Sequence, residues 1–128
     1  MRIRKVAAVT MAASALAGCG SKKSDEKVIK IGVFEPTTGE NGGGGYQEVL
    51  GIRYANEMHP TVNIGGEEYA VRLVEVDNKS DKTEAVNAAQ KLVSVKVSVV
   101  LGSYGSGVSI AAGQIFADAK IPSIGCSC

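Results

Sequence analysis

Residues 101–107 combine residue types that bind small anions. They read Leu-Gly-Ser-Tyr-Gly-Ser-Gly and join an apolar run to a helical pattern. In an open α/β sheet, ligands bind beyond the carboxyl ends of the strands, and the unpaired amides at the start of the next helix favour an anion such as a carboxylate. We expect Ser106 to offer a hydroxyl near the helix start. Gly105 and Gly107 would let the backbone approach a ligand closely.

The same segment also fits a structural role, in which Ser106 only caps its helix and the glycines only form the turn. Its spacing, Gly-x-x-Gly-x-Gly, differs from the dinucleotide-binding pattern Gly-x-Gly-x-x-Gly, and no Gly-Lys-Ser/Thr phosphate loop occurs. A nucleotide-using enzyme would also need a phosphate-binding pattern after Phe34, which residues 35–39 do not provide. The sequence leaves the ligand-binding and structural interpretations open and disfavours a nucleotide site.

Other reactive side chains form no recognisable catalytic or metal-binding pattern. His59, the only histidine, precedes a proline at a predicted helix end and fits a surface residue. Asp77 ends a predicted strand and fits either a ligand contact or a solvated turn with residues 78–80. Cys126 and Cys128 are two positions apart, where a disulfide is strained, and they fit small residues at a strand end. We therefore predict no enzymatic activity, no metal and no cofactor.

Apolar runs alternate with helical patterns along the chain. A short hairpin through residues 62–66 leads into the second long strand, and Asp81 with Glu84 three residues later has the form of a capping box. Residues 35–45, with four consecutive glycines, are predicted to form a loop. This order predicts an α/β fold with a parallel, doubly wound, Rossmann-like sheet and helices on both faces. The predicted strands are 28–34, 69–76, 97–101 and one that begins at 121–124, and the predicted helices are 46–58, 81–93 and 108–119.

The N-terminal residues have the pattern of an export signal. Three basic residues among the first five precede twelve uncharged residues, 6–17, and small residues follow them. A twelve-residue helix spans about 18 Å, which is too short to cross a bilayer core. An amphipathic first helix is the alternative, but this stretch has no polar face. Residues 20–27 are polar and lack periodicity, as expected of a tether.

The composition suits a folded domain without a nucleic-acid partner. Hydrophobic residues make up 45% of the 128 residues and charged residues 21%, with a formal net charge of +1. These values exclude a disordered or collagen-like chain. Without the basic residues of the export signal the chain is slightly acidic, so it lacks the positive charge by which proteins bind nucleic acid.

Several motifs together resemble a known family. Residues 30–39 (Lys-Ile-Gly-Val-Phe-Glu-Pro-Thr-Thr-Gly) resemble the opening of type I substrate-binding proteins of ABC importers, the leucine/isoleucine/valine-binding kind. Residues 51–57 look like their first helix, and 101–107 look like their ligand loop. Residues 16–19 (Leu-Ala-Gly-Cys) resemble the lipobox of bacterial lipoproteins, in which the cysteine, here Cys19, is lipidated and becomes the first mature residue.

The resemblance implies a division of the chain and a fold. Residues 1–18 would be a lipoprotein signal peptide, 19–27 a polar tether, and 28–128 the N-terminal part of a ligand-binding domain. The fold would be the first part of lobe 1 of the two-lobe periplasmic binding protein type I fold. Because members run to several hundred residues, we expect this chain to be a fragment that lacks the second lobe and the hinge.

The resemblance also implies a function. The protein would be a solute receptor anchored to the cell membrane by Cys19, with its domain outside the cytoplasm and an ABC permease as its partner. It would bind an amino acid, by family default a branched-chain one, or a related small molecule by closure of its lobes. The alternative is a sensor module of the same fold for amides, urea or amino acids that feeds a signalling partner.

Six residues are implied as ligand contacts. In the family the loop after the third long strand binds the amino-acid carboxylate, and Ser106 matches the serine that does so. Tyr104 and Gly105 match the wall and backbone positions of that loop, which Gly107 completes. Ser127 and Cys128 lie in the turn after the next strand, which adds further contacts. The family often has an aromatic residue in the loop after the first strand; near that position this chain has Gly44, and Tyr46 is expected to be close enough to compensate.

Overall fold

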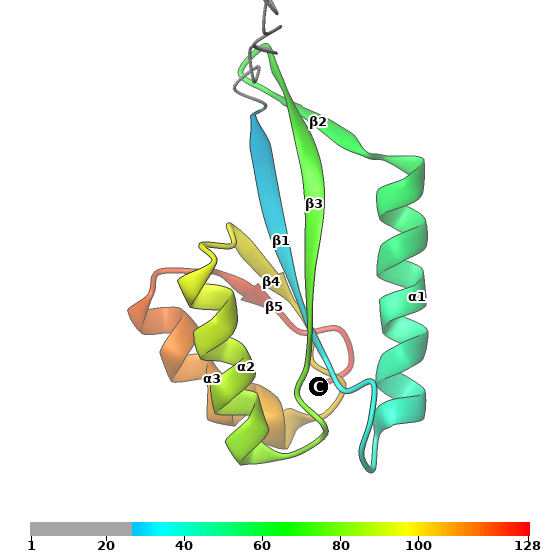
Figure 1. Ribbon diagram of the computed structural model, residues 1–128, viewed down its shortest axis with the longest axis vertical. Helices are drawn as coiled ribbons and strands as arrows, with labels where there is room; N and C mark the ends of the chain where they lie inside the picture. Colours follow the sequence, from blue (N-terminus) through cyan, green and yellow to red (C-terminus); the bar gives the residue numbers. More distant parts are fainter. Residues whose placement is uncertain (1–26) are drawn as a thin grey trace, which may run out of the picture.

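The computed structural model describes residues 27–128 as a single sheet with helices on both faces (Figure 1). The predicted signal peptide, Cys19 and the tether up to residue 26 lie outside the described residues. No helix within residues 27–128 combines the length and the apolar character needed to cross a bilayer. The elements are β1 (Val28–Glu35), α1 (Gly42–Met58), β2 (Thr61–Ile64), β3 (Glu67–Asp77), α2 (Lys82–Ser94), β4 (Val99–Leu101), α3 (Ser106–Asp118) and β5 (Ser123–Ile124).

The five strands lie in the order β2-β3-β1-β4-β5. All neighbours are parallel except β2 and β3, which form the predicted antiparallel hairpin. An isolated bridge between Tyr104 and Ser127 continues the β4–β5 pairing beyond the strands. Because parallel strands end at the same edge, the loops after β1, β3, β4 and β5 meet there. The predicted mostly parallel, doubly wound α/β sheet is confirmed.

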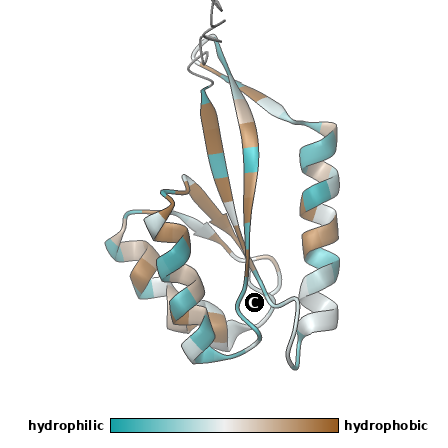
Figure 2. Cartoon of the chain, in the orientation of Figure 1, coloured by the Kyte–Doolittle hydropathy of each residue, from teal (hydrophilic) through white to brown (hydrophobic). Residues whose placement is uncertain are grey.

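The core lies between the sheet and helices α2 and α3. Fully or almost fully buried side chains include Phe34, Leu92 and Val100, and the rings of Phe34 and Phe116 pack edge to face with centroids 5.5 Å apart. Brown apolar segments of β1, β3 and β4 in Figure 2 run alongside these helices. The two helices also pack on one another. This packing fixes the ends of β1 and β4, from which the loops of the site emerge.

Helix α1 covers the opposite face and begins four residues before the predicted start. The glycines of residues 42–45 are its first turn, not part of a loop, and the Gly45 amide donates to the Asn41 carbonyl at 3.1 Å. A Cβ at Gly45 would overlap the carbonyl oxygen of Pro36. Glycine therefore allows the helix start to lie against the end of β1, which a pattern based on helix propensity misses.

The remaining boundaries differ from the prediction by a few residues. Strand β4 starts at Val99, α3 starts at Ser106 instead of 108, and β1 extends through Glu35. The predicted cap of α2 is confirmed, since the Asp81 carboxylate accepts the amides of Thr83 and Glu84 at 2.8 and 2.9 Å. The shift at Glu35 matters most, because it places a carboxyl group inside the sheet.

Candidate ligand-binding site

The predicted ligand loop lies between β4 and α3. Gly105 is the N-cap of α3 and has a φ of 112°, a conformation suited to glycine. Ser106 is the first helical residue; it is exposed, and its hydroxyl makes no hydrogen bond to any residue in 27–128. The interpretation in which Ser106 only caps the helix is therefore wrong. Its hydroxyl is accessible from solvent.

Several donors converge at the start of α3. The amides of Ser106 and Gly107 precede the first helical hydrogen bond, and no acidic residue lies in this first turn. A small open hollow of about 90 Å³ lies beside them, and Lys82 and the Asn41 side chain line it. The positive end of the helix and a lysine favour an anion here, and the volume suits a carboxylate group. The sequence had not singled out Lys82 or Asn41.

Buried polar side chains hold this loop in place from beneath. Asn78 follows β3, and its side-chain amide donates to the Ser103 hydroxyl at 2.9 Å, with both residues 0% exposed. The Gly102 amide donates to the Ile124 carbonyl at 3.0 Å, and the Gly105 amide to the Ser127 carbonyl at 3.3 Å. A solvated turn at residues 78–80 was therefore wrong for Asn78. The available signal was an asparagine directly after β3, at the same edge of the sheet as the polar, glycine-rich loop after β4.

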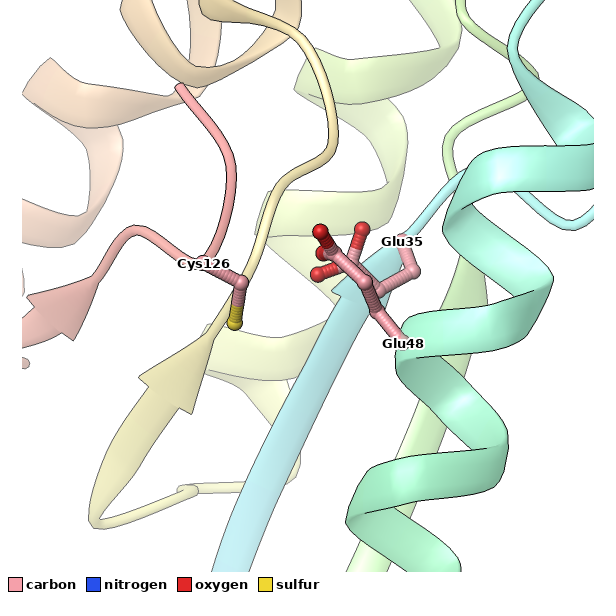
Figure 3. Close-up of side chains that lie close together, drawn as sticks. All are labelled: Glu35, Glu48 and Cys126. Atoms are coloured by element: carbon pink, nitrogen blue, oxygen red, sulfur yellow. The ribbon is translucent and has the colours of Figure 1, made fainter.

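Glu35, the last residue of β1, is the second support of the loop. It is 0% exposed, and its Oε2 accepts the Tyr104 amide at 2.6 Å. Glu48 of α1 faces it, and the two carboxyl groups meet in Figure 3. Burial raises the pKa of Glu35 to about 8, the nearby Glu48 carboxyl adds to the increase, and the Tyr104 amide opposes it. From its sequence context Glu35 was expected in a loop, and no local pattern connects it with Glu48.

Cys126 lies next to this pair, but the three side chains do not suit a zinc ion. Their oxygen and sulfur atoms come within 4.8 Å of one another. Structural and catalytic zinc sites are built around at least two histidine or cysteine ligands, whereas this group offers one cysteine and two carboxyls. Partial burial and the carboxyls of Glu35 and Glu48 raise the pKa of the Cys126 thiol. In Figure 3 the sulfur stands beside the carboxyl pair and is not directed between the two groups.

Asp77 is the last residue of β3, and its carboxylate binds the loop after β1 and not the ligand loop. Its carboxylate accepts the Thr38 hydroxyl at 2.6 Å and the amides of Lys79 and Thr37 at 2.8 and 3.0 Å. Partial burial acts to raise its pKa, but these hydrogen bonds outweigh burial and lower the pKa to about 2. Because neighbouring groups already engage both oxygens, Asp77 has a structural role.

The structure brings most of the predicted contacts together. Gly105, Ser106 and Gly107 lie at the start of α3, and the backbone of Ser127 pairs with Tyr104. Cys128 follows at the same edge; it and Cys126 are both exposed free thiols. The Tyr104 ring occupies the space above Gly44, where a Cβ would lie 2.6 Å from Cζ. Tyr104 thus fills the place that the resemblance assigned to an aromatic residue near position 44.

A larger hollow of about 580 Å³ lies elsewhere, between α1 and the sheet. Its lining is mainly apolar, with side chains such as Ile52 and Leu73, and includes the predicted surface residue His59. It contains no lysine, arginine or carboxylate. The edge of the sheet with Ser106 therefore suits a charged solute better than the larger hollow does.

Known proteins match most of the described chain in sequence and fold. Residues 28–128 match the periplasmic binding protein family. The chain is 32% identical over 107 residues to Leu/Ile/Val-binding protein homolog 1 of Brucella abortus, a match that covers 83% of this chain and 28% of the relative. The chain therefore spans about 28% of that relative's length.

Two solved structures of similar proteins support the fold. The leucine-binding protein LivK of Thermotoga maritima has a TM-score of 0.70 and 37% identity, covering 77% of this chain and 27% of that chain. The branched-chain amino acid transporter substrate-binding protein LivJ of Streptococcus pneumoniae, in complex with isoleucine, has a TM-score of 0.69 and 31% identity. That match covers 79% of this chain and 29% of LivJ.

Proposed function

The chain belongs to the periplasmic binding protein family, and from this premise we propose that it acts outside the cytoplasm as the solute receptor of an ABC importer. Its solute would be an amino acid, with leucine, isoleucine and valine as the first candidates. The names of its relatives and the isoleucine complex of LivJ support that choice. The proposal involves binding and transfer to a permease, without covalent chemistry.

The observation that carries the proposal is a set of hydrogen-bond donors at the start of α3 that have no partner within residues 27–128. The Ser106 hydroxyl and the amides of Ser106 and Gly107 would hold the carboxylate of the amino acid, with Lys82 nearby. Tyr104 would form the wall on one side of the ligand. The adjacent turn with Ser127 and Cys128 would add further contacts.

The proposal extends to membrane attachment and closure. Residues 1–18 would be removed as a signal peptide, Cys19 would carry the lipid, and residues 19–27 would separate the lipid from the domain. Two or more acyl chains are needed for stable anchoring, since one chain gives only marginal binding. Capture would involve closure of two lobes around a hinge, of which this chain would supply part of the first.

Saturation-transfer NMR with leucine, isoleucine and valine tests the assignment, because it detects the weak binding expected of one side of a site. Leucine methyl ester, which lacks the carboxylate, is the matched ligand control. We expect leucine to bind and the ester to bind at least tenfold more weakly.

Two variants localise that binding. Ser106→Ala should weaken leucine binding about tenfold, since a hydrogen bond to a charged group contributes about 1.5 kcal/mol. Ser98→Ala is the control, because Ser98 is an exposed serine just before β4, at the other end of that strand. Equal binding of leucine and its ester, or equal loss in both variants, would contradict the proposed site.

A further inference from the structure

We propose that Glu35 and Glu48 share a single proton, and that this carboxyl pair is a positioning device that fixes the ligand loop through Tyr104. The inference concerns two residues that nothing above assigns to ligand binding. It rests on the proposed function only in the statement that the positioned loop binds the solute. The pairing itself is independent of any ligand.

Two carboxyl oxygens of the pair lack hydrogen-bond partners within residues 27–128. Glu35 Oε1 and Glu48 Oε2 are both buried and accept no hydrogen bond from residues 27–128. Figure 3 shows the carboxyl group of Glu48 reaching from α1 to that of Glu35 on β1. Two carboxyl groups this close, one of them fully buried, do not both ionise at neutral pH. One proton between them gives an O–H donor on one group and an acceptor on the other, which satisfies both oxygens.

Within residues 27–128, no ion pair joins a lysine or arginine to Glu35 or Glu48. From the loop after β4, the backbone amide of Tyr104 faces Glu35, and from the turn after β5 the Cys126 thiol does so. Cys128 lies beside Cys126 and is also a thiol. On β3 the register partner of Glu35 is Asp77, whose carboxylate is engaged by the Thr37–Thr38 segment and Lys79. A proton is therefore the neutralising species that these surroundings supply.

The loop after β4 fits closely over the Glu35 carboxyl group. The Tyr104 amide donates to Oε2 at 2.6 Å, while a Cβ at Gly102 would lie 2.6 Å from Oε1. Because Gly102, with a φ of 119°, has no Cβ, the backbone can lie directly against the carboxyl group. If the shared proton is lost, both carboxyl groups carry a negative charge and repel one another. Glu48 then moves away from Glu35, and the position of the loop that Glu35 holds through the Tyr104 amide changes.

The direction of the pH dependence follows from the raised pKa of Glu35, which burial and Glu48 increase to about 8. Below this pH the pair keeps its proton and the loop stays fixed. Above it both groups are charged, the loop loses its position, and affinity for an anionic solute falls. We expect affinity for leucine to fall between pH 6.5 and pH 9.5 by at least threefold more in the wild type than in Glu35→Gln, since ionisation of the leucine ammonium group affects both proteins equally.

Carbon-13 NMR of the glutamate side-chain carboxyls, recorded from pH 5 to 10 together with the Tyr104 amide signal, tests the pair without a ligand. We expect one ionisation of the pair near pH 8, with the Tyr104 amide moving in the same transition. Glu48→Gln should remove this transition, because the glutamine amide donates to Glu35 without a titrating proton. Glu57→Gln, at an exposed position of the same helix, should leave it unchanged.

Three results would overturn the inference. These are ionisation of both groups near their ordinary pKa, a transition that persists in Glu48→Gln, and micromolar ZnCl₂ binding that Cys126→Ser abolishes, since a cation would then balance the pair. Glu35→Gln is the second variant if Glu48→Gln does not fold, and it should make the Tyr104 amide independent of pH. A shared proton without leucine binding would refute the proposed solute and leave the pair established.

Discussion

Glu35 and Asp77 occupy matching positions at the ends of two neighbouring parallel strands, where they are register partners, yet they differ in charge. Asp77 is partly exposed and receives hydrogen bonds from a hydroxyl and several amides, and its pKa falls to about 2. Glu35 is fully buried, receives one amide and faces a second carboxyl, and its pKa rises to about 8. Although both carboxyls end neighbouring strands, burial keeps Glu35 protonated, whereas several hydrogen-bond donors keep the partly exposed Asp77 charged.

The two carboxyl groups hold two different segments of the chain. The charged Asp77 holds the segment at Thr37 and Thr38 that leads from β1 to α1. The protonated pair around Glu35 holds the loop after β4, where the predicted ligand contacts lie. The hydrogen bonds of Asp77 should therefore be lost in acid, and those of the Glu35–Glu48 pair should change in alkali.

The largest effect is expected where the ligand loop crosses Glu35. Gly102→Ala places a Cβ against the Phe34 carbonyl at a φ of 119°. It should lower the free energy of unfolding by about 3 kcal/mol or more, as measured by urea denaturation. Gly43→Ala is the control, because no atom lies within 4 Å of that Cβ and alanine favours a helix by up to about 1 kcal/mol. Similar values for the two variants would contradict the close fit of the loop.

The next largest loss of stability is expected at the hydrogen bond between two uncharged side chains that also holds the ligand loop. Asn78→Ala removes the hydrogen bond to Ser103 between two fully buried groups, and it should cost about 1–3 kcal/mol. In a double-mutant cycle with Ser103→Ala, the combined loss should be smaller than the sum of the single losses. Additive losses would show that the two side chains do not depend on one another.

A smaller effect is expected for Asp77→Ala, about 1 kcal/mol at pH 7, because solvent screens a partly exposed group. The lowered pKa of Asp77 gives a stabilising contribution that is complete above pH 3.8 and is lost as the pH falls through about 2. Thermal unfolding between pH 2 and 5 should therefore show a weaker acid dependence in Asp77→Ala. An unchanged acid dependence would assign this role to another carboxylate.

The alkaline counterpart is expected at Glu35, where the quantity compared is a pH dependence and not the loss of stability at one pH. A folded-state pKa raised from 4.5 to about 8 gives a stabilising contribution that is complete below pH 4.5 and is lost as the pH rises through about 8. The Tm of the wild type should fall between pH 5 and 9 relative to that of Glu35→Gln. Parallel Tm curves for the two proteins would contradict the raised pKa.

The sequence predicted what depends on local patterns. The β2–β3 hairpin, the Asp81 cap and the position of Ser106 beyond a buried strand follow from short-range spacing. The start of α1 at Gly42 and the contacts of Glu35 could not be predicted in this way. They depend on residues 9 to 69 positions away, such as Pro36 against Gly45 and Tyr104 against Glu35. Such contacts form only when the strands lie side by side in the sheet, so the spacing of residues along the chain does not predict them.

The most direct test of the account is a map of amide chemical shifts in a ¹H–¹⁵N spectrum during titration with leucine at pH 6.5. The account predicts that signals from residues 102–107 and Ser127 move, while those of Ile52 and Leu73 beside the larger apolar hollow stay in place. Movement confined to the lining of that hollow, or no movement at millimolar leucine, would contradict it.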